Sequence, residues 1–341
     1  MSYDYRADET DGQAQAPYQM DNDDTDFGGP DADDSRPRLL LMGRQASGKT
    51  SIGRVVFQHL SPNETGFIST TSAIEKKKPV ASFLDLQIWD IPGQLDLSAI
   101  DKQGMFSQDG SLVFVVDSQL KDARGVASAL CEIVQEAYQI NNNLHFEVLL
   151  HKIDMLGEEE KRSFTNQIHE ALHSALFGVD AQISFYLTSI YDVSIFEAMS
   201  KIAQKLVPQF PAMQGMLDTL AGRSDMVKAF VFDVSTKIYV ATDSRVVDVS
   251  LYEACSDAID LAKETSSVLS EGMHSSTSQG IANTLEATIP IHRYVLYLRR
   301  INNLLAVVAV MDRERFEAKT AVIKANVEAF CNSVEELLAQ Q

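Results

Sequence analysis

The most informative stretch of the chain reads Gly43-Arg44-Gln45-Ala46-Ser47-Gly48-Lys49-Thr50. It follows the apolar residues 39–42 and precedes a predicted helix over residues 51–60, which is the strand-loop-helix context that the phosphate loop G-x-x-x-x-G-K-[ST] requires. In such a loop, backbone N–H groups surround a polyphosphate, the lysine reaches its β and γ oxygens, and the threonine hydroxyl can ligate Mg²⁺. The alternative is a capped turn that only shares the pattern. Candidate phosphate-binding residues are Gly43, Arg44, Gln45, Ala46, Ser47, Gly48, Lys49, Thr50 and Ser51.

Charge is unevenly distributed along the chain. The 341 residues carry a net charge of −19, which argues against a dominant nucleic-acid-binding surface. Residues 1–35 hold 11 acidic residues and one basic residue, so the rest of the chain is only mildly acidic. Residues 1–37 are therefore expected to form a disordered acidic tail, either as a solvating segment or as a docking arm. The remaining length allows two folded domains.

The cysteines and the two chain ends indicate in which cellular environment the protein works and whether it could attach to a membrane. Cys131, Cys255 and Cys331 are odd in number and far apart, which indicates a reducing environment such as the cytoplasm. No segment reaches the roughly 18 apolar residues of a membrane span, and the acidic N-terminus does not resemble a signal peptide. Position 2 is Ser2 rather than Gly, and the C-terminus has no prenylation cysteine. We therefore expect any membrane association to depend on a partner.

Apolar runs alternate with helical patterns over residues 38–209, the order typical of a doubly wound parallel α/β sheet. Strands are predicted at residues 39–43, 84–91, 111–117, 145–153 and 183–188, and helices at 51–60, 123–139, 159–175 and 194–207.

A different order begins after Pro208 and Pro211 and predicts an α+β domain over residues 210–341. It consists of a helix at 213–221, a hairpin of strands 229–234 and 238–242, a helix at 249–268, strands 294–301 and 304–311, and a last helix at 316–338. A serine-rich loop containing Ser266, Ser267, Ser270 and residues 275–278 is expected between the second helix and the second strand pair. The strand pair 294–298 and 304–311 either extends a sheet across a dimer or only faces its own helices.

The strand predicted at 84–91 leads into Asp90-Ile91-Pro92-Gly93-Gln94. An Asp at this strand end can hold Mg²⁺ through water, the Gly93 N–H can face a γ-phosphate, and Gln94 can orient the attacking water. Gln94 is thus the candidate catalytic residue. An ordinary strand-end turn is the alternative.

Two further motifs concern the base. His151-Lys152-Ile153-Asp154 is close to the Asn-Lys-x-Asp motif, in which the carboxylate accepts hydrogen bonds from guanine N1–H and N2, donors that adenine cannot present together. Ser189 and Ile190 follow the next strand, where backbone N–H groups of a small-residue loop can reach guanine O6. Because all these motifs fall at successive strand ends, they are expected at one edge of one sheet.

These stretches together resemble the Rag GTPases, of the RagC/RagD type and its fungal Gtr counterparts. The resemblance covers residue 38 to the end. Within that range it is also carried by the stretches Ser61-Pro62-Asn63-Glu64-Thr65 and Lys228-Ala229-Phe230-Val231-Phe232-Asp233-Val234. His151 in place of Asn is itself a feature of that family.

The resemblance implies a Ras-like P-loop GTPase domain followed by a roadblock (longin-like) domain that forms an obligate heterodimer with a RagA/RagB-type GTPase. It implies GTP/GDP and Mg²⁺ as ligands, with Thr50, Thr71 and Asp90 at the metal, Thr71 being the switch I threonine. It further implies a cytoplasmic protein held peripherally on the lysosomal or vacuolar membrane by a lipidated scaffold (Ragulator/EGO-like), a GTPase-activating protein, and recruitment of TOR complex 1 when amino acids are plentiful. Nothing in the sequence encodes which nucleotide state is active.

Gln45 and Ala46 stand where fast Ras-like GTPases have small glycines. We hypothesise that a side chain at position 45 crowds the attacking water, so that hydrolysis is slow without an activating protein. A scaffold that binds nucleotide mainly for stability is the alternative function, and an ATP-dependent enzyme is disfavoured by Asp154.

Overall fold

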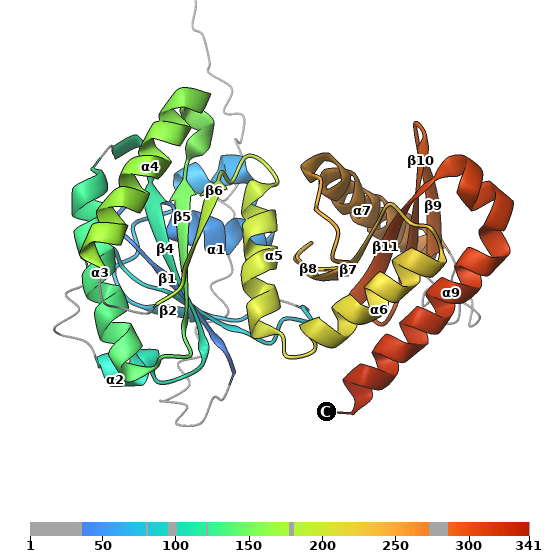
Figure 1. Ribbon diagram of the computed structural model, residues 1–341, viewed down its shortest axis with the longest axis horizontal. Helices are drawn as coiled ribbons and strands as arrows, with labels where there is room; N and C mark the ends of the chain where they lie inside the picture. The colour runs from blue at the N-terminus through green and yellow to red at the C-terminus, as the bar shows by residue number, and fades with distance from the viewer. Residues whose placement is uncertain are drawn as a thin grey trace, which may run out of the picture. The chain divides into compact units, whose positions relative to one another are not determined.

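The computed structural model describes residues 36–79, 81–94, 101–120, 122–176, 181–272 and 286–340. Its first sheet has the order β2-β3-β1-β4-β5-β6 (Figure 1). Five strands run parallel, as predicted: β1 (Arg38–Met42), β3 (Gln87–Asp90), β4 (Gly110–Asp117), β5 (His145–His151) and β6 (Ile183–Thr188).

The sixth strand, β2 (Glu75–Lys77), was not predicted, and it pairs antiparallel with β3 at the edge of the sheet. Its Glu-Lys-Lys sequence lacks the apolar signal of a buried strand. Two predicted strands are also too long. β3 begins only at Gln87, and β5 ends at His151, after which residues 153–155 form a 3₁₀ turn.

Helices cover both faces of this sheet because side chains alternate along each strand. Leu39 and Leu41 of β1 pack with α1 (Lys49–Gln58) and α5 (Ser194–Leu206), whereas Leu40 and Met42 pack with α3 (Ala123–Ile140) and α4 (Glu158–Ala175). These four helices confirm the predicted ones to within two residues. A short fifth helix, α2 (Lys102–Phe106), was not predicted; its N-cap Asp101 accepts a hydrogen bond from the Gly104 N–H.

The second sheet is antiparallel, with the order β8-β7-β11-β10-β9. α7 (Val249–Gly272) packs on one face, and α6 (Phe210–Arg223) and α9 (Arg313–Ala339) pack on the other (Figure 1). The strands are β7 (Lys228–Asp233), β8 (Tyr239–Thr242), β9 (Glu286–Ile291), β10 (Tyr294–Arg300) and β11 (Leu305–Asp312). The architecture is thus the predicted α/β domain followed by an α+β domain. The boundary between residues 209 and 210 stays a prediction.

The structure departs from the expectations for this second part at two points and excludes one of two open alternatives. α7 continues to Gly272, so Ser266, Ser267 and Ser270 lie in a helix rather than in a loop; residues 275–278 lie outside the described residues, as does most of the predicted tail. β9 was missed. It pairs with β10, and β10 pairs with β11, so both predicted strands have neighbours on each side and cannot extend the sheet. The edge strands are β8 and β9.

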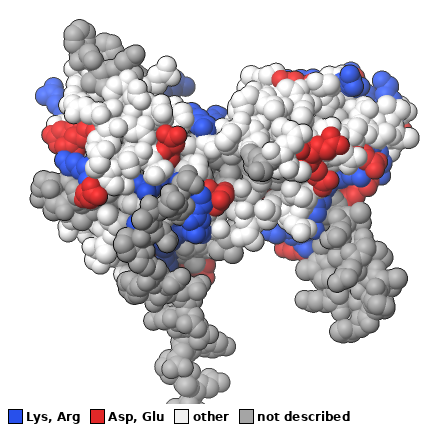
Figure 2. Space-filling view, turned by 90° about the horizontal axis from the view of Figure 1, so that it is seen from below, with Lys and Arg blue, Asp and Glu red and all other residues white. Residues whose placement is uncertain are grey.

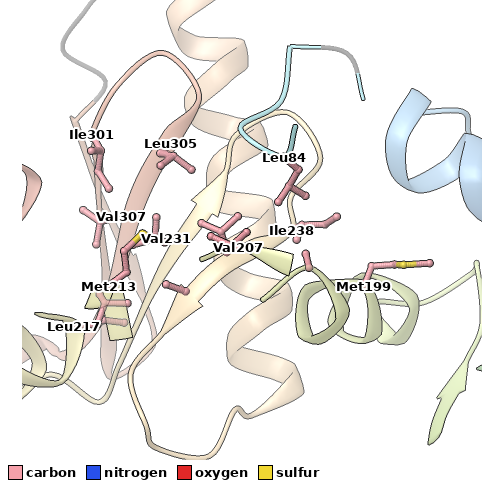
Figure 3. Packing of buried hydrophobic residues seen from close by; sticks show 14 of the residues in the cluster. Leu84, Met199, Val207, Met213, Leu217, Val231, Ile238, Ile301, Leu305 and Val307 are labelled. Atoms are coloured by element: carbon pink, nitrogen blue, oxygen red, sulfur yellow. The ribbon is translucent and has the colours of Figure 1, made fainter. Parts of the chain in front are cut away.

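One hydrophobic cluster contains residues of both sheets, and α5 lies between them. Ile195, Met199 and Ile202 of α5 belong to the same cluster as Leu41 of β1 and Val231 of β7. Figure 3 shows part of it, with Met199 and Val207 from the α5 segment near Ile238. A hydrogen bond also joins α5 to the second sheet, since the Tyr239 N–H of β8 donates to the Ser200 hydroxyl of α5 over 3.1 Å.

The surface carries no extended basic area on the face drawn in Figure 2, where Lys and Arg lie in small groups beside Asp and Glu. Within the described ranges, none of the helices has the length and apolarity that crossing a bilayer requires. Cys131, Cys255 and Cys331 are buried and free.

Ile202→Ala tests the shared core. Ile202 is 1% exposed, and truncating a buried Ile to Ala costs about 2–5 kcal/mol. We expect a lower midpoint of thermal unfolding, measured by circular dichroism. Lys201→Ala is the matched control, because its side chain lies on the surface in an ion pair with Glu197 and such pairs contribute about 1 kcal/mol or less. Equal midpoints for the two variants would contradict the proposed packing.

Candidate nucleotide-binding site

The loop between β1 and α1 has the backbone of a phosphate cradle. Gly43 and Gly48 have φ angles of +136° and +104°, which residues with a Cβ rarely adopt, and a Cβ on Gly43 would lie 2.3 Å from the carbonyl oxygen of Val115. The Lys49 ammonium donates to the carbonyl oxygens of Gly43 (2.9 Å) and Arg44 (2.8 Å), which holds it at the loop. Burial lowers the pKa of Lys49, and Asp90 opposes this shift.

The other loop residues differ in what their side chains do. Arg44 points to the start of α3, where it pairs with Asp122 at 2.9 Å, so only its backbone faces the loop. Gln45 and Ala46 are exposed, and Ser51 is half-buried on α1. Ser47 is 1% exposed, and its hydroxyl has no hydrogen-bond partner among the described residues. Such a buried polar atom is what a site for a polar ligand contains.

Thr50, Thr71 and Asp90 come together from three separate segments. The Thr50 hydroxyl lies 2.8 Å from the Thr71 hydroxyl and donates to Asp90 Oδ2 over 2.6 Å, while Thr71 donates to the same oxygen over 3.4 Å. The neighbouring Thr70 is exposed. The structure therefore brings together the three residues predicted to ligate the metal.

These residues fit Mg²⁺. Asp90 Oδ1 is buried without a hydrogen-bond partner among the described residues, and burial raises the pKa of Asp90 although the Thr50 hydrogen bond opposes this. A carboxylate and two hydroxyls are hard oxygen ligands that Mg²⁺ accepts alongside phosphate and water. A bound cation would compensate the buried carboxylate.

Gly93 and Gln94 lie against the phosphate loop. A Cβ on Gly93 would lie 2.2 Å from the Gln45 nitrogen, so only glycine fits between Pro92 and Gln94 at this approach. The Gln94 side-chain amide donates to the Gln45 side-chain oxygen. The predicted catalytic residue is therefore held by the residue that was predicted to crowd the attacking water.

The base motif is tied to the loop by Lys152. Its ammonium donates to the Ala46 carbonyl and to Asp117 Oδ2, each over 2.7 Å. Asp154 lies on the following 3₁₀ turn, and its Oδ1 accepts a hydrogen bond from the Ser189 hydroxyl over 2.6 Å. Ser189 thus orients the carboxylate predicted to read guanine, while Ile190 is half-buried against the core.

His151 packs between three of the motifs. It is 1% exposed, its Nδ1 shares a hydrogen bond of 3.0 Å with the Thr188 hydroxyl, and its ring lies so close to Gly48 that a Cβ there would be 2.8 Å from His151 Cδ2. Burial, with the nearby Lys152 charge as the second cause, lowers the pKa of His151 to about 4. The imidazole is therefore neutral near pH 7, and it supports the site without being placed to contact a ligand.

The structure thus brings the predicted residues together at the carboxyl ends of the parallel strands. Sequence reasoning missed two supporting residues, Asp117 and Ser194, and the contact of Thr188 with His151. The Ser194 hydroxyl accepts from the Ser189 N–H over 2.9 Å. The available signal for Asp117 was its position at the end of a predicted strand.

Comparison with known proteins agrees with this site. Residues 38–259 match the protein-family model described as "Gtr1/RagA G protein conserved region". The chain belongs to the Gtr1/RagA family of G proteins. Proteins of this family are GTPases that bind guanine nucleotide, and this chain is one of them.

The relatives also indicate the type of subunit. The chain is 39% identical to Ras-related GTP-binding protein C of Mus musculus, over 90% of this chain and 78% of that protein. It is 38% identical to GTP-binding protein gtr2 of Schizosaccharomyces pombe, over 89% of this chain and 99% of that protein. Identity to GTP-binding protein GTR1 of Saccharomyces cerevisiae is 26%, over 62% of this chain and 70% of that protein. The G protein is therefore of the RagC/Gtr2 type, as the sequence stretches predicted.

The buried His151 predicts acid sensitivity of the fold. Its pKa is about 4 in the folded chain against an ordinary value of 6.5, so the unfolded state binds more protons between these values. Above pH 6.5 the His151 ring is neutral in both states and costs the fold nothing. As the pH falls from 6.5 towards 4, the free energy of unfolding decreases by up to about 3 kcal/mol.

We expect His151→Asn, which cannot titrate, to lose less unfolding free energy than the wild type between pH 7 and pH 4.5. Urea titrations at both pH values measure the difference, and comparing the pH dependence within each variant removes any constant cost of the substitution. Parallel pH profiles for the two proteins would show that His151 is not the group responsible.

Proposed function

We propose that this RagC-type G protein is a Mg²⁺-dependent switch that alternates between GTP and GDP. The observation that carries the proposal is the contact of Thr71 with Thr50 and Asp90. Thr71 lies in the segment between α1 and β2, whereas Thr50 and Asp90 belong to framework elements. A γ-phosphate with its Mg²⁺ at this point would hold the Thr71 segment in a way that GDP does not, which is how a GTPase switch I is ordered.

The base pocket supports selectivity for guanine. Asp154 is oriented by Ser189, and its carboxylate presents acceptors only, so it matches the paired N–H donors of guanine. Lys152 is fixed by Ala46 and Asp117, so the base motif and the phosphate loop form one site.

Asp154→Asn tests this pocket. The substitution replaces one acceptor oxygen by a donor group, so we expect preference to move from guanine to xanthine nucleotides. Affinities for GDP and XDP, measured by isothermal titration calorimetry, give the result directly. Asp225→Asn is the control, because Asp225 pairs with Arg315 in the second domain rather than lying in the motif. Unchanged GDP affinity in Asp154→Asn would refute the base pocket.

Slow intrinsic hydrolysis is the second part of the proposal. Gln94 must orient the attacking water, yet its amide is engaged by Gln45. Releasing it costs the free energy of one hydrogen bond, roughly 1 kcal/mol, or about a fivefold reduction in rate. An activating protein would replace this contact.

We therefore expect Gln45→Ala to raise single-turnover GTP hydrolysis about fivefold. The gain should vanish in Gln45→Ala/Gln94→Ala, because Gln94 is the residue released. Arg44→Ala is the matched loop control, since Arg44 points to Asp122. The idea fails if the wild type already hydrolyses GTP rapidly unaided, or if Gln45→Ala is no faster than the wild type.

We further propose the heterodimeric role that the family resemblance implies. Matches to both Gtr2-type and Gtr1/RagA-type proteins support pairing with a RagA/RagB-type GTPase. Within the part of the chain that the structure describes, β8 and β9 are the edge strands of the second sheet and the ones available for pairing. On this proposal the dimer sits on the lysosomal or vacuolar membrane through a lipidated scaffold and relays amino-acid sufficiency to TOR complex 1.

The scaffold alternative differs from the switch in how partner binding depends on the bound nucleotide. A switch changes its partner binding with nucleotide state, whereas a nucleotide-stabilised scaffold does not. Partner capture by the heterodimer loaded with GDP or with a non-hydrolysable GTP analogue distinguishes them, and equal capture in both states would favour the scaffold.

A further inference from the structure

Two large side chains that flank Asp154 are exposed although the residues around them are ordered by hydrogen bonds. Met155, directly after Asp154, is 69% exposed, and Tyr191, two residues after Ser189, is 61% exposed. They follow the carboxyl ends of β5 and β6, which are neighbouring strands of the sheet. Exposed apolar groups beside a polar binding residue are typical of a ligand site whose ligand covers them.

The backbone at Tyr191 is fixed relative to Asp154. The Ser189 hydroxyl donates to Asp154 Oδ1 over 2.6 Å and accepts from the Tyr191 N–H over 3.2 Å. One hydroxyl therefore joins the carboxylate predicted to read the base edge to the backbone that carries the tyrosine ring. These two hydrogen bonds hold the backbone of Tyr191, and with it the start of its side chain, close to the base site.

A purine base is flat and has two faces to protect from water. The Lys152 ammonium is fixed by Ala46 and Asp117, which assigns its aliphatic stem to one face. Among the described residues, the exposed aromatic side chains are Tyr191 and Phe67, the latter 91% exposed at the end of the 3₁₀ helix Pro62–Phe67. Only Tyr191 is connected to Asp154 by hydrogen bonds.

We propose that Tyr191 stacks on the second face of the guanine base, with Met155 beside it. The inference rests on the proposed guanine pocket and adds a residue to it. The tyrosine ring offers a flat, polarisable surface to any base, so it contributes affinity while Asp154 supplies the selectivity.

The test compares Tyr191→Ala, Tyr191→Phe and Phe67→Ala in the full chain. Stacking on an aromatic ring contributes enough for a loss of about tenfold or more in affinity when the ring is removed. We expect Tyr191→Ala to bind Mg²⁺-GDP about tenfold more weakly and Tyr191→Phe to bind it like the wild type. Inorganic tripolyphosphate with Mg²⁺ is the second probe; because it has no base, its affinity should be the same in all variants.

A fluorescence measurement adds a direct readout. The chain has a single tryptophan, Trp89, which is buried next to Asp90, so the wild type is titrated in parallel and its signal is subtracted. Tyr191→Trp should show fluorescence quenching on GDP binding, because guanine stacked on indole quenches it, whereas tripolyphosphate should leave the signal unchanged. Tyr138→Trp, at the half-exposed Tyr138 of α3, should not respond to either probe.

Three outcomes would overturn the proposal. Unchanged GDP affinity in Tyr191→Ala, with a loss in Phe67→Ala, would assign the second face to Phe67. Equal losses for GDP and tripolyphosphate in Tyr191→Ala would show that the substitution disturbs the whole site. Loss of GDP affinity in Tyr191→Phe as well would place the effect in the hydroxyl rather than in the ring. Failure of the guanine pocket itself is seen separately, as a wild type that binds tripolyphosphate but not GDP.

Discussion

A single ammonium group, that of Lys152, holds the ends of three strands together. Lys152 follows β5, its partner Asp117 ends β4, and its partner Ala46 lies in the loop that follows β1. β4 lies between β1 and β5 in the sheet, so the loop that follows β1 must extend past the end of β4 to bring the Ala46 carbonyl to the Lys152 ammonium. Together with the packing of His151 on Gly48, these two hydrogen bonds join the phosphate loop and the base motif into one site.

The binding site also holds two buried charged groups of opposite sign, Lys49 and Asp90, whose charged forms are both disfavoured by burial. Burial lowers the pKa of Lys49 and raises that of Asp90, which means that each residue resists its charged form. A polyphosphate and a divalent cation have the charges that relieve the two effects, the first at Lys49 and the second at Asp90. Ligand binding and fold stability are therefore coupled, because a ligand that binds only the folded chain adds to its stability. The buried Ser47 hydroxyl, which has no partner among the described residues, would likewise gain a hydrogen bond from a polar ligand.

The parts that were predictable from sequence are those with a local signal. The glycines of residues 43–48, the runs of buried apolar residues in β1, β4 and β5, and the motif order all report on one edge of one sheet. β2 was missed because Glu75-Lys76-Lys77 is an edge strand with no core to bury. β9 was missed although Ala287, Ile289 and Ile291 alternate, because Pro290 argues against a strand except at a sheet edge. The contact of Asp117 with Lys152 and that of Gln45 with Gln94 depend on side chains 35 or more residues apart meeting in space, which no local pattern encodes.

The shared core around α5 has a consequence for how this chain can be divided. The helix ends the first sheet's domain in sequence, yet its Ile195, Met199 and Ile202 pack in a cluster that includes residues of the second sheet. A fragment that stopped after Leu206 would keep every nucleotide-binding motif but would expose part of this apolar surface to water. The nucleotide-binding motifs therefore end before the apolar packing that α5 needs, and a change in the tilt of α5 would alter the packing against both sheets.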